Sequence, residues 1–260
     1  MWKRLFQSKT KRRAEIMARP FPAEWASIIR KHAPYAESLN DGEQRRLEEH
    51  MLVFLDEKHF EGCGGLTLTD EMRVTITAHA CLPLINRETD YYPGLVSVLV
   101  YPDTFLAPEE TEQPDGTILG EPDPRDGESW DRGAVIVAWE RFLARYEEPV
   151  PNNVILHEFA HQLDLENGEI DGAPMLDDNG QYEEWARVCR REFERLTAAA
   201  EHGEETLLDP YGAEEPSEFF AVLVETFFEA PVALRDEHPS LYRIMSKYLR
   251  QDPASRLTTE

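Results

Sequence analysis

The stretch VILHEFAHQLD, residues 154–164, decides the fold and the chemistry available to this chain. On a helix, residues four apart lie one above the other on the same face, so His157 and His161 can bind one metal ion. Imidazoles with this spacing are typical of a zinc site, and Glu158 is placed to take a proton from a metal-bound water. The alternative is a helix whose two histidines are ordinary hydrogen-bonded residues. A third ligand would decide between these interpretations.

A catalytic zinc takes three protein ligands and leaves its fourth position to water. The His-x-x-Gly-x-x-His extension of another zinc-protease class is absent, because Asp164 and Asn167 stand where that motif needs Gly and His. The third ligand must therefore come from elsewhere, and the candidates are Asp164, Glu183, Glu184, Glu218, Glu225, His202 and His238.

Burial favours two of these candidates, Glu218 and Glu225. They lie two helical turns apart on one face of residues 216–229, the most apolar segment of the chain, where a carboxylate needs a metal or a partner. Glu218 is the better candidate because it lies in the first turn, and we expect Glu225 to support the ligands without binding the metal. A salt bridge to a local arginine is the alternative for a buried glutamate.

Asp164 lies three residues after His161, on the face of the helix that carries both histidines. It could orient a ligand imidazole by accepting the second ring N–H, a role that zinc sites commonly contain. A local hydrogen bond at the end of the helix is the alternative.

The pattern of apolar residues predicts an α+β fold, with helices, a few strands, and then more helices. The expected strands span residues 96–101 and 134–139, the second as a sheet edge that pairs with extended substrate. Residues 102–129 are expected to form a long acidic loop, with room for a short hairpin. Helices are expected over residues 23–34, 41–59, 69–81, 154–166, 181–200 and 216–229, and from residue 239.

We expect a basic, flexible tail over residues 1–19, a single globular unit over 20–255, and a short C-terminal tail over 256–260. Within the unit, residues 20–68 form an N-terminal helical part and residues 69–255 the catalytic core. The first 19 residues hold seven Lys or Arg and one acid. Such a tail is either solvated or able to dock on an acidic membrane or partner.

The charge and cysteine content narrow the functional classes. The 260 residues carry a net charge of −24, which excludes direct nucleic-acid binding through a basic face. Three cysteines with no Cys-x-x-Cys spacing indicate reduced thiols, and the start of the chain lacks the apolar core of a secretory signal. No apolar run is long enough to cross a bilayer. The expected location is the cytoplasm.

Longer motifs resemble the Mlc titration factor A family, which are cytoplasmic zinc peptidases of bacteria. The resemblance extends over nearly the whole length, from residue 21 to residue 253. Its most specific parts are residues 157–164 with 167–168, and residues 209–213 running into 216–222.

This resemblance implies a zincin-like metallopeptidase core of the gluzincin type, a small mixed sheet with an active-site helix on which the N-terminal helices pack. It implies Zn²⁺ held by His157, His161 and Glu218, with Glu158 as general base. The core would be similar to that of anthrax lethal factor, in which a Tyr seven residues before the ligand Glu helps at the oxyanion, as Tyr211 would here.

The resemblance also implies aminopeptidase-type hydrolysis of peptides, and a repressor partner of the Mlc type. The rival interpretation is a sequestering protein with a zincin fold in which hydrolysis is incidental. A structural zinc site would need a fourth protein ligand, for which Asp164 is the only nearby candidate.

Overall fold

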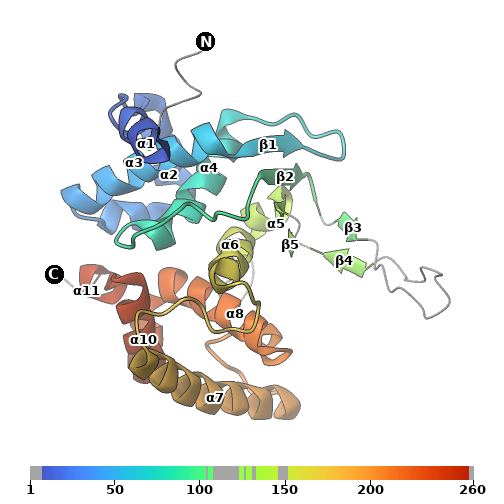
Figure 1. Cartoon of the computed structure of the whole chain (residues 1–260). Helices are drawn as coiled ribbons and strands as arrows, with labels where there is room; N and C mark the ends of the chain where they lie inside the picture. The colour runs from blue at the N-terminus through green and yellow to red at the C-terminus, as the bar shows by residue number, and fades with distance from the viewer. Residues whose placement is uncertain are drawn as a thin grey trace.

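The computed structural model describes residues 8–103, 105–107, 123–125, 127–130, 133–145 and 152–257. Helix α6 (Val154–Asp164), which carries the His-Glu-x-x-His run, lies at the centre of the molecule. The N-terminal helices lie on one side of it and the C-terminal helices on the other (Figure 1). Helices predominate over one small mixed sheet, so the predicted α+β class and zincin-like architecture are confirmed.

The main sheet has the strand order β1 (His59–Gly62), β2 (Ser97–Tyr101), β6 (Ala134–Ala138), β5 (Gly127–Trp130). The first three strands are parallel, and β5 runs antiparallel to β6. A separate antiparallel pair joins β3 (Phe105–Ala107) to β4 (Asp123–Arg125), which matches the short hairpin expected within the acidic segment. Residues 108–122 of that segment lie outside the described residues.

The prediction that residues 134–139 form a sheet edge is wrong. Strand β6 pairs with β2 on one side and β5 on the other, so β5 is the edge strand. Four of the five residues of β6 are buried, as expected for the uninterrupted apolar run Ala-Val-Ile-Val-Ala in an interior strand. The last predicted residue, Trp139, begins helix α5 (Trp139–Ala144) instead.

The N-terminal layer consists of α1 (Lys9–Met17), α2 (Ala23–His32), α3 (Asp41–Glu57) and α4 (Asp70–Cys81), with the 3₁₀ turns η2 (Pro34–Ser38) and η3 (Leu82–Leu84). Helices α3 and α4 begin at side-chain caps, Asn40 and Thr69, close to where the sequence predicted them. The pattern of β-branched residues in α4 also suits a strand, but burial of nearly its whole length in the core favours the helix.

The predicted flexible tail is wrong for residues 9–17, which form α1 against α3; residues 1–7 lie outside the described residues. Arg13 donates to Glu57 at 2.7 Å and to Asp90 at 2.6 Å, and Ile16 is buried. The hydrogen bond from Arg13 lowers the pKa of Glu57. Acidic residues of α3 and of the loop before β2 therefore pair with this basic segment, which its composition alone could not indicate.

The C-terminal layer contains α7 (Asn179–His202), α8 (Pro216–Glu229), α9 (Pro231–Glu237), α10 (Pro239–Leu249) and α11 (Pro253–Leu257), with the 3₁₀ turns η4 (Leu165–Asn167) and η5 (Pro210–Ala213). The predicted tail from residue 256 is wrong for its first two residues, which belong to α11. Arg256 donates to Glu43 of α3 at 2.5 Å and so holds this end of the chain on the N-terminal layer.

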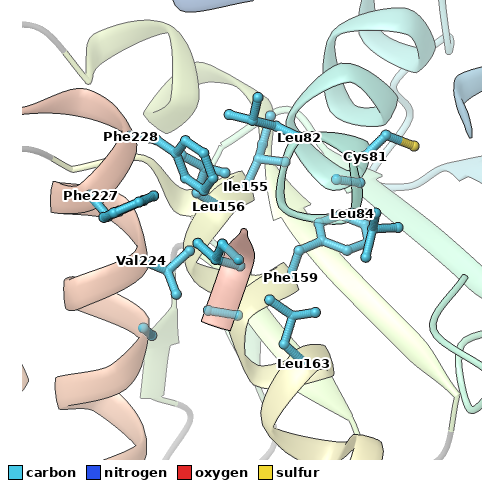
Figure 2. Close-up of a cluster of buried hydrophobic side chains, with 14 of the residues drawn as sticks. Cys81, Leu82, Leu84, Ile155, Leu156, Phe159, Leu163, Val224, Phe227 and Phe228 are labelled. Atoms are coloured by element: carbon cyan, nitrogen blue, oxygen red, sulfur yellow. The ribbon is translucent and has the colours of Figure 1, made fainter. Parts of the chain in front are cut away.

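The apolar core joins α4, η3, α6 and α8. Figure 2 shows Leu84 and Cys81, Phe159 and Leu163, and Val224 and Phe227 approaching one another from these segments. Full burial of side chains of this size contributes about 1.5–3 kcal/mol each. Because the core fixes one face of α6 against one face of α8, the polar residues of both helices are brought together beside it. Among the described residues, no helix is long and apolar enough to span a bilayer.

Candidate metal centre

Helix α6 presents its histidines because both of its ends are fixed. At its start the side chain of Asn153 accepts from the backbone N–H of Leu156 at 3.2 Å. At its end η4 leads to Gly168, whose φ of +98° suits glycine. Ile155, Phe159 and other apolar residues occupy the core face, so His157 and His161 emerge on the side that faces α8.

The structure brings His157, His161 and Glu218 together. The Nε2 atoms of the two imidazoles are 3.2 Å apart, His157 Nε2 is 2.9 Å from Glu218 Oε2, and His161 Nε2 is 3.5 Å from Glu218 Oε1. Ligand atoms around a tetrahedral zinc lie about 3.3 Å from one another. The three separations therefore fit the edges of one face of a zinc tetrahedron, and two nitrogens plus a carboxylate are donors that zinc accepts.

Charge is stabilised at this centre in spite of burial. Burial raises the pKa of Glu218, but hydrogen bonds with His157 and His161 outweigh it and hold that pKa well below the usual range. Burial likewise lowers the pKa of His157, yet hydrogen bonds with Glu218 and Glu225 raise it well above its ordinary value. Glu218 is therefore a carboxylate at neutral pH, which is the form that binds a metal.

Glu225 lies behind His157. One of its oxygens accepts from His157 Nδ1 at 2.8 Å, and the other accepts from the backbone N–H of Asn153. Because Nδ1–H is bound to Glu225, loss of a proton from His157 would come from Nε2 and leave the lone pair on the atom that faces Glu218. Glu225 thus holds the imidazole of His157 from behind and is not part of the group of three that could hold a metal.

Asp164 makes a local hydrogen bond near the end of its helix, which was the alternative considered from the sequence. Its Oδ2 accepts from the backbone N–H of Gly172 at 2.7 Å, while its Oδ1 and the Nδ1 of His161 have no hydrogen-bond partner among the described residues. The expected hydrogen bond from a ligand imidazole is therefore not made. Burial raises the pKa of Asp164 to about 6, although the N–H of Gly172 opposes that shift.

The loop that follows η4 fixes the start of α8, and this contact was not expected from the sequence. Gly172 has a φ of +76°, and a Cβ there would lie 2.2 Å from the carbonyl oxygen of Pro216. Trp185 of α7 donates its indole N–H to the carbonyl of Gly172 at 2.9 Å. Pro216 is two residues before Glu218, so this contact lies at the start of the helix that carries the carboxylate.

Glu158 and Tyr211 complete the candidate site. Glu158 is only 4% exposed, and its charge raises the pKa of the adjacent His157. The ring of Tyr211 is centred 5.8 Å from that of His157, and 47% of the residue is exposed. Asp209 fixes the η5 turn by accepting from the backbone N–H of Tyr211 at 2.9 Å. Tyr211 thus lies beside the imidazole of His157 and is about half exposed.

The remaining candidate ligands lie elsewhere. Glu184 pairs with Arg243 at 2.5 Å, His202 bonds to the carbonyl of Ala198, and His238 bonds to Glu192. Among the described residues, His157, His161 and Glu218 form the only group of three or more that could hold a metal ion. A structural site with four protein ligands therefore finds no support here.

Comparison with known proteins agrees with this geometry. Residues 7–250 match the family described as Glucose-regulated metallo-peptidase M90. This chain belongs to that family. Among its relatives, an uncharacterized protein of Synechocystis sp. is 39% identical over 247 residues, which cover 93% of this chain and 89% of that protein.

Two further relatives of this chain are each named Mlc titration factor A. The protein from Pectobacterium atrosepticum is 33% identical over 236 residues, covering 90% of this chain and 88% of its own length. The protein from Serratia proteamaculans is 30% identical over 241 residues, covering 90% and 89%. The resemblance seen in the sequence is therefore confirmed, and this chain is a member of a metallopeptidase family.

Proposed function

We propose that this protein is a zinc-dependent peptidase, with aminopeptidase-type specificity, in which His157, His161 and Glu218 hold the metal. The observation that carries this proposal is the set of three separations among the ligand atoms, from 2.9 to 3.5 Å. Three protein ligands leave one position for water, as in catalytic zinc sites.

Bound Zn²⁺ would supply an acidified water and a Lewis acid for the scissile carbonyl. Glu158 would serve as the base that takes a proton from the attacking water and as the acid that gives it to the leaving amine. Tyr211 donates its hydroxyl proton in a hydrogen bond to the developing oxyanion. Glu225 holds the ring of His157 through Nδ1. The net charge of −24 favours a substrate with a free α-amino group.

Strand β5 is proposed to bind the substrate backbone. It is the edge of the main sheet, and both β5 and β6 contact α6. An extended peptide could add to this edge through main-chain hydrogen bonds and so lie across the metal centre.

Hydrolysis of amino-acid anilides and short peptides, before and after removal of zinc with a chelator, tests the proposal. Glu158→Gln should lower kcat by at least 100-fold, about the value of a positioned general base, while still binding one zinc ion per chain. Glu183→Gln, an exposed glutamate on α7, is the control and should leave kcat unchanged. Equal rates for wild type and Glu158→Gln would reject the catalytic assignment.

A repressor of the Mlc type is a second proposed partner, supported by the name of two relatives. The expected site of action is the cytoplasm. A pulldown with such a repressor, using wild type and Glu158→Gln, separates binding from hydrolysis. Equal capture by both proteins, with no anilide hydrolysis by either, would favour a sequestering protein over a peptidase.

A further inference from the structure

A buried polar chain runs from the metal centre into the N-terminal layer. It begins at Glu225, which bonds to His157, and passes through Asn153 to His79 of α4 and then to Tyr35 of η2. Asn153 and His79 are fully buried, and Glu225 is 4% exposed. Buried polar groups are expensive unless each is hydrogen-bonded, so a chain of this length needs an explanation.

Asn153 is the branch point of this chain. Its backbone N–H donates to Glu225, and its side-chain oxygen caps α6 at Leu156 N. Its amide nitrogen donates to Glu229 at 2.5 Å and to His79 Nδ1 at 3.1 Å. The cap fixes which side-chain atom is oxygen, because a backbone N–H can only donate. Capping α6 uses only the side-chain oxygen, so the two hydrogen bonds made by the amide nitrogen are not needed for the cap.

The ring of His79 can be assigned from its partners. Asn153 can only donate to its Nδ1, so Nδ1 accepts, and the hydroxyl of Tyr35 donates to the same atom at 2.7 Å. The Nε2–H then donates to the carbonyl of His32 at 3.0 Å. Burial, together with the charge of Arg145, lowers the pKa of His79 to about 3. His79 is therefore neutral and fixed at both nitrogens.

We propose that Asn153 is a positioning residue for the metal centre, and that His79 and Tyr35 hold it in register with the N-terminal layer. Through its backbone N–H, Asn153 fixes the carboxylate of Glu225, which in turn orients the ring of His157. The N-terminal helices then contribute to metal affinity without supplying a ligand. Partners of metal-ligating histidines commonly change metal affinity about 10–100-fold when removed. This inference rests on the proposed zinc site.

A matched pair of substitutions isolates this role from helix capping. Asn153 caps α6, and Asn40 caps α3 and donates its amide to Glu43 at 2.9 Å. Asn153→Ser and Asn40→Ser both keep a hydroxyl cap and both lose an amide donor to a glutamate. The amide partner is Glu229 for Asn153 and Glu43 for Asn40. The two variants differ in that Asn153→Ser also loses the bond to His79, which holds in place the backbone N–H that donates to Glu225 beside His157.

The measurements are zinc affinity, by competition with a chromophoric chelator, and the visible spectrum of the Co²⁺-loaded protein, alongside urea unfolding without metal. Asn153→Ser should weaken zinc binding at least tenfold and shift the Co²⁺ bands, whereas Asn40→Ser should keep zinc affinity within about twofold of wild type. Equal zinc affinity in the two serine variants would overturn the proposal.

Tyr35→Phe keeps the test decisive if Asn153→Ser does not fold. It removes one hydroxyl at the far end of the chain and should weaken zinc binding by a few-fold, because His79 loses its strongest donor. Unchanged zinc affinity and an unchanged Co²⁺ spectrum in that variant would overturn the inference. Failure of the wild type itself to bind zinc would instead reject the proposed metal site and this inference with it.

Discussion

Replacement of Gly172 by alanine should impair the metal centre although Gly172 touches no ligand. A Cβ at this position would lie 2.2 Å from the carbonyl oxygen and 2.7 Å from the carbonyl carbon of Pro216, where ordinary contact begins at 3.4 Å. Both atoms belong to the backbone, so no side-chain rotation relieves the overlap. The start of α8 must then withdraw by more than 1 Å, and Glu218 must withdraw with it.

Two separate effects lower the free energy of unfolding of Gly172→Ala. Alanine in left-handed backbone, at the φ of +76°, costs about 1 kcal/mol. Forcing an extra carbon into a packed contact costs a further 1–3 kcal/mol or so. The free energy of unfolding should therefore fall by about 2–4 kcal/mol. Displacement of a reacting group by about 1 Å lowers rates about 100-fold, so anilide hydrolysis should fall by a similar factor.

Gly65→Ala is the matched control for Gly172→Ala. Gly65 has a φ of +82°, but a Cβ there would meet nothing within 4 Å. It should lose about 1 kcal/mol in urea unfolding and keep wild-type zinc affinity. If Gly172→Ala matches Gly65→Ala in both unfolding and zinc competition, the contact with Pro216 does not position Glu218 and the reasoning is refuted.

Further predictions concern the reaction, the metal and the pH dependence. Tyr211→Phe should lower kcat by about 100–1,000-fold with zinc affinity unchanged, as expected for loss of an oxyanion donor; an unchanged kcat would remove Tyr211 from the mechanism. Free zinc at 100 times its Kd should raise the free energy of unfolding of the wild type by about 2.7 kcal/mol, and by nothing in Glu218→Ala. Burial lowers the pKa of His50 from 6.5 to about 4, so the unfolded state binds this proton first as pH falls. The free energy of unfolding of the wild type should therefore fall between pH 6.5 and pH 4, and it should fall more steeply than that of His50→Gln. The difference in slope should reach about 1.4 kcal/mol per pH unit. Parallel plots of unfolding free energy against pH for the two proteins would contradict this.

Local patterns were enough to predict most of the helices. The caps at Asn40, Thr69 and Asn153 and the all-apolar run of α8 each depend on a few neighbouring residues. The spacing of the histidines and the position of Glu218 in the first turn of α8 were also readable, because both follow from helical geometry.

What could not be predicted depends on contacts between distant segments. The docking of α1 depends on Glu57 and Asp90, and the position of β6 inside the sheet depends on a partner strand in a segment that looked like loop. The bond from Asp164 to Gly172 replaced a bond to an imidazole, because a loop backbone lies closer. Gly172 was the signal for this loop contact in the sequence, because glycine readily adopts the left-handed backbone found there.

The convergence of His157, His161 and Glu218 on one divalent cation is tested most directly by zinc K-edge X-ray absorption of the zinc-loaded chain, read beside zinc content. One zinc per chain is expected, with two imidazoles and only oxygen donors besides, and Glu218→Ala should lose the metal or change the spectrum. A spectrum with sulfur ligands, or one that is the same in wild type and Glu218→Ala, would contradict the assignment.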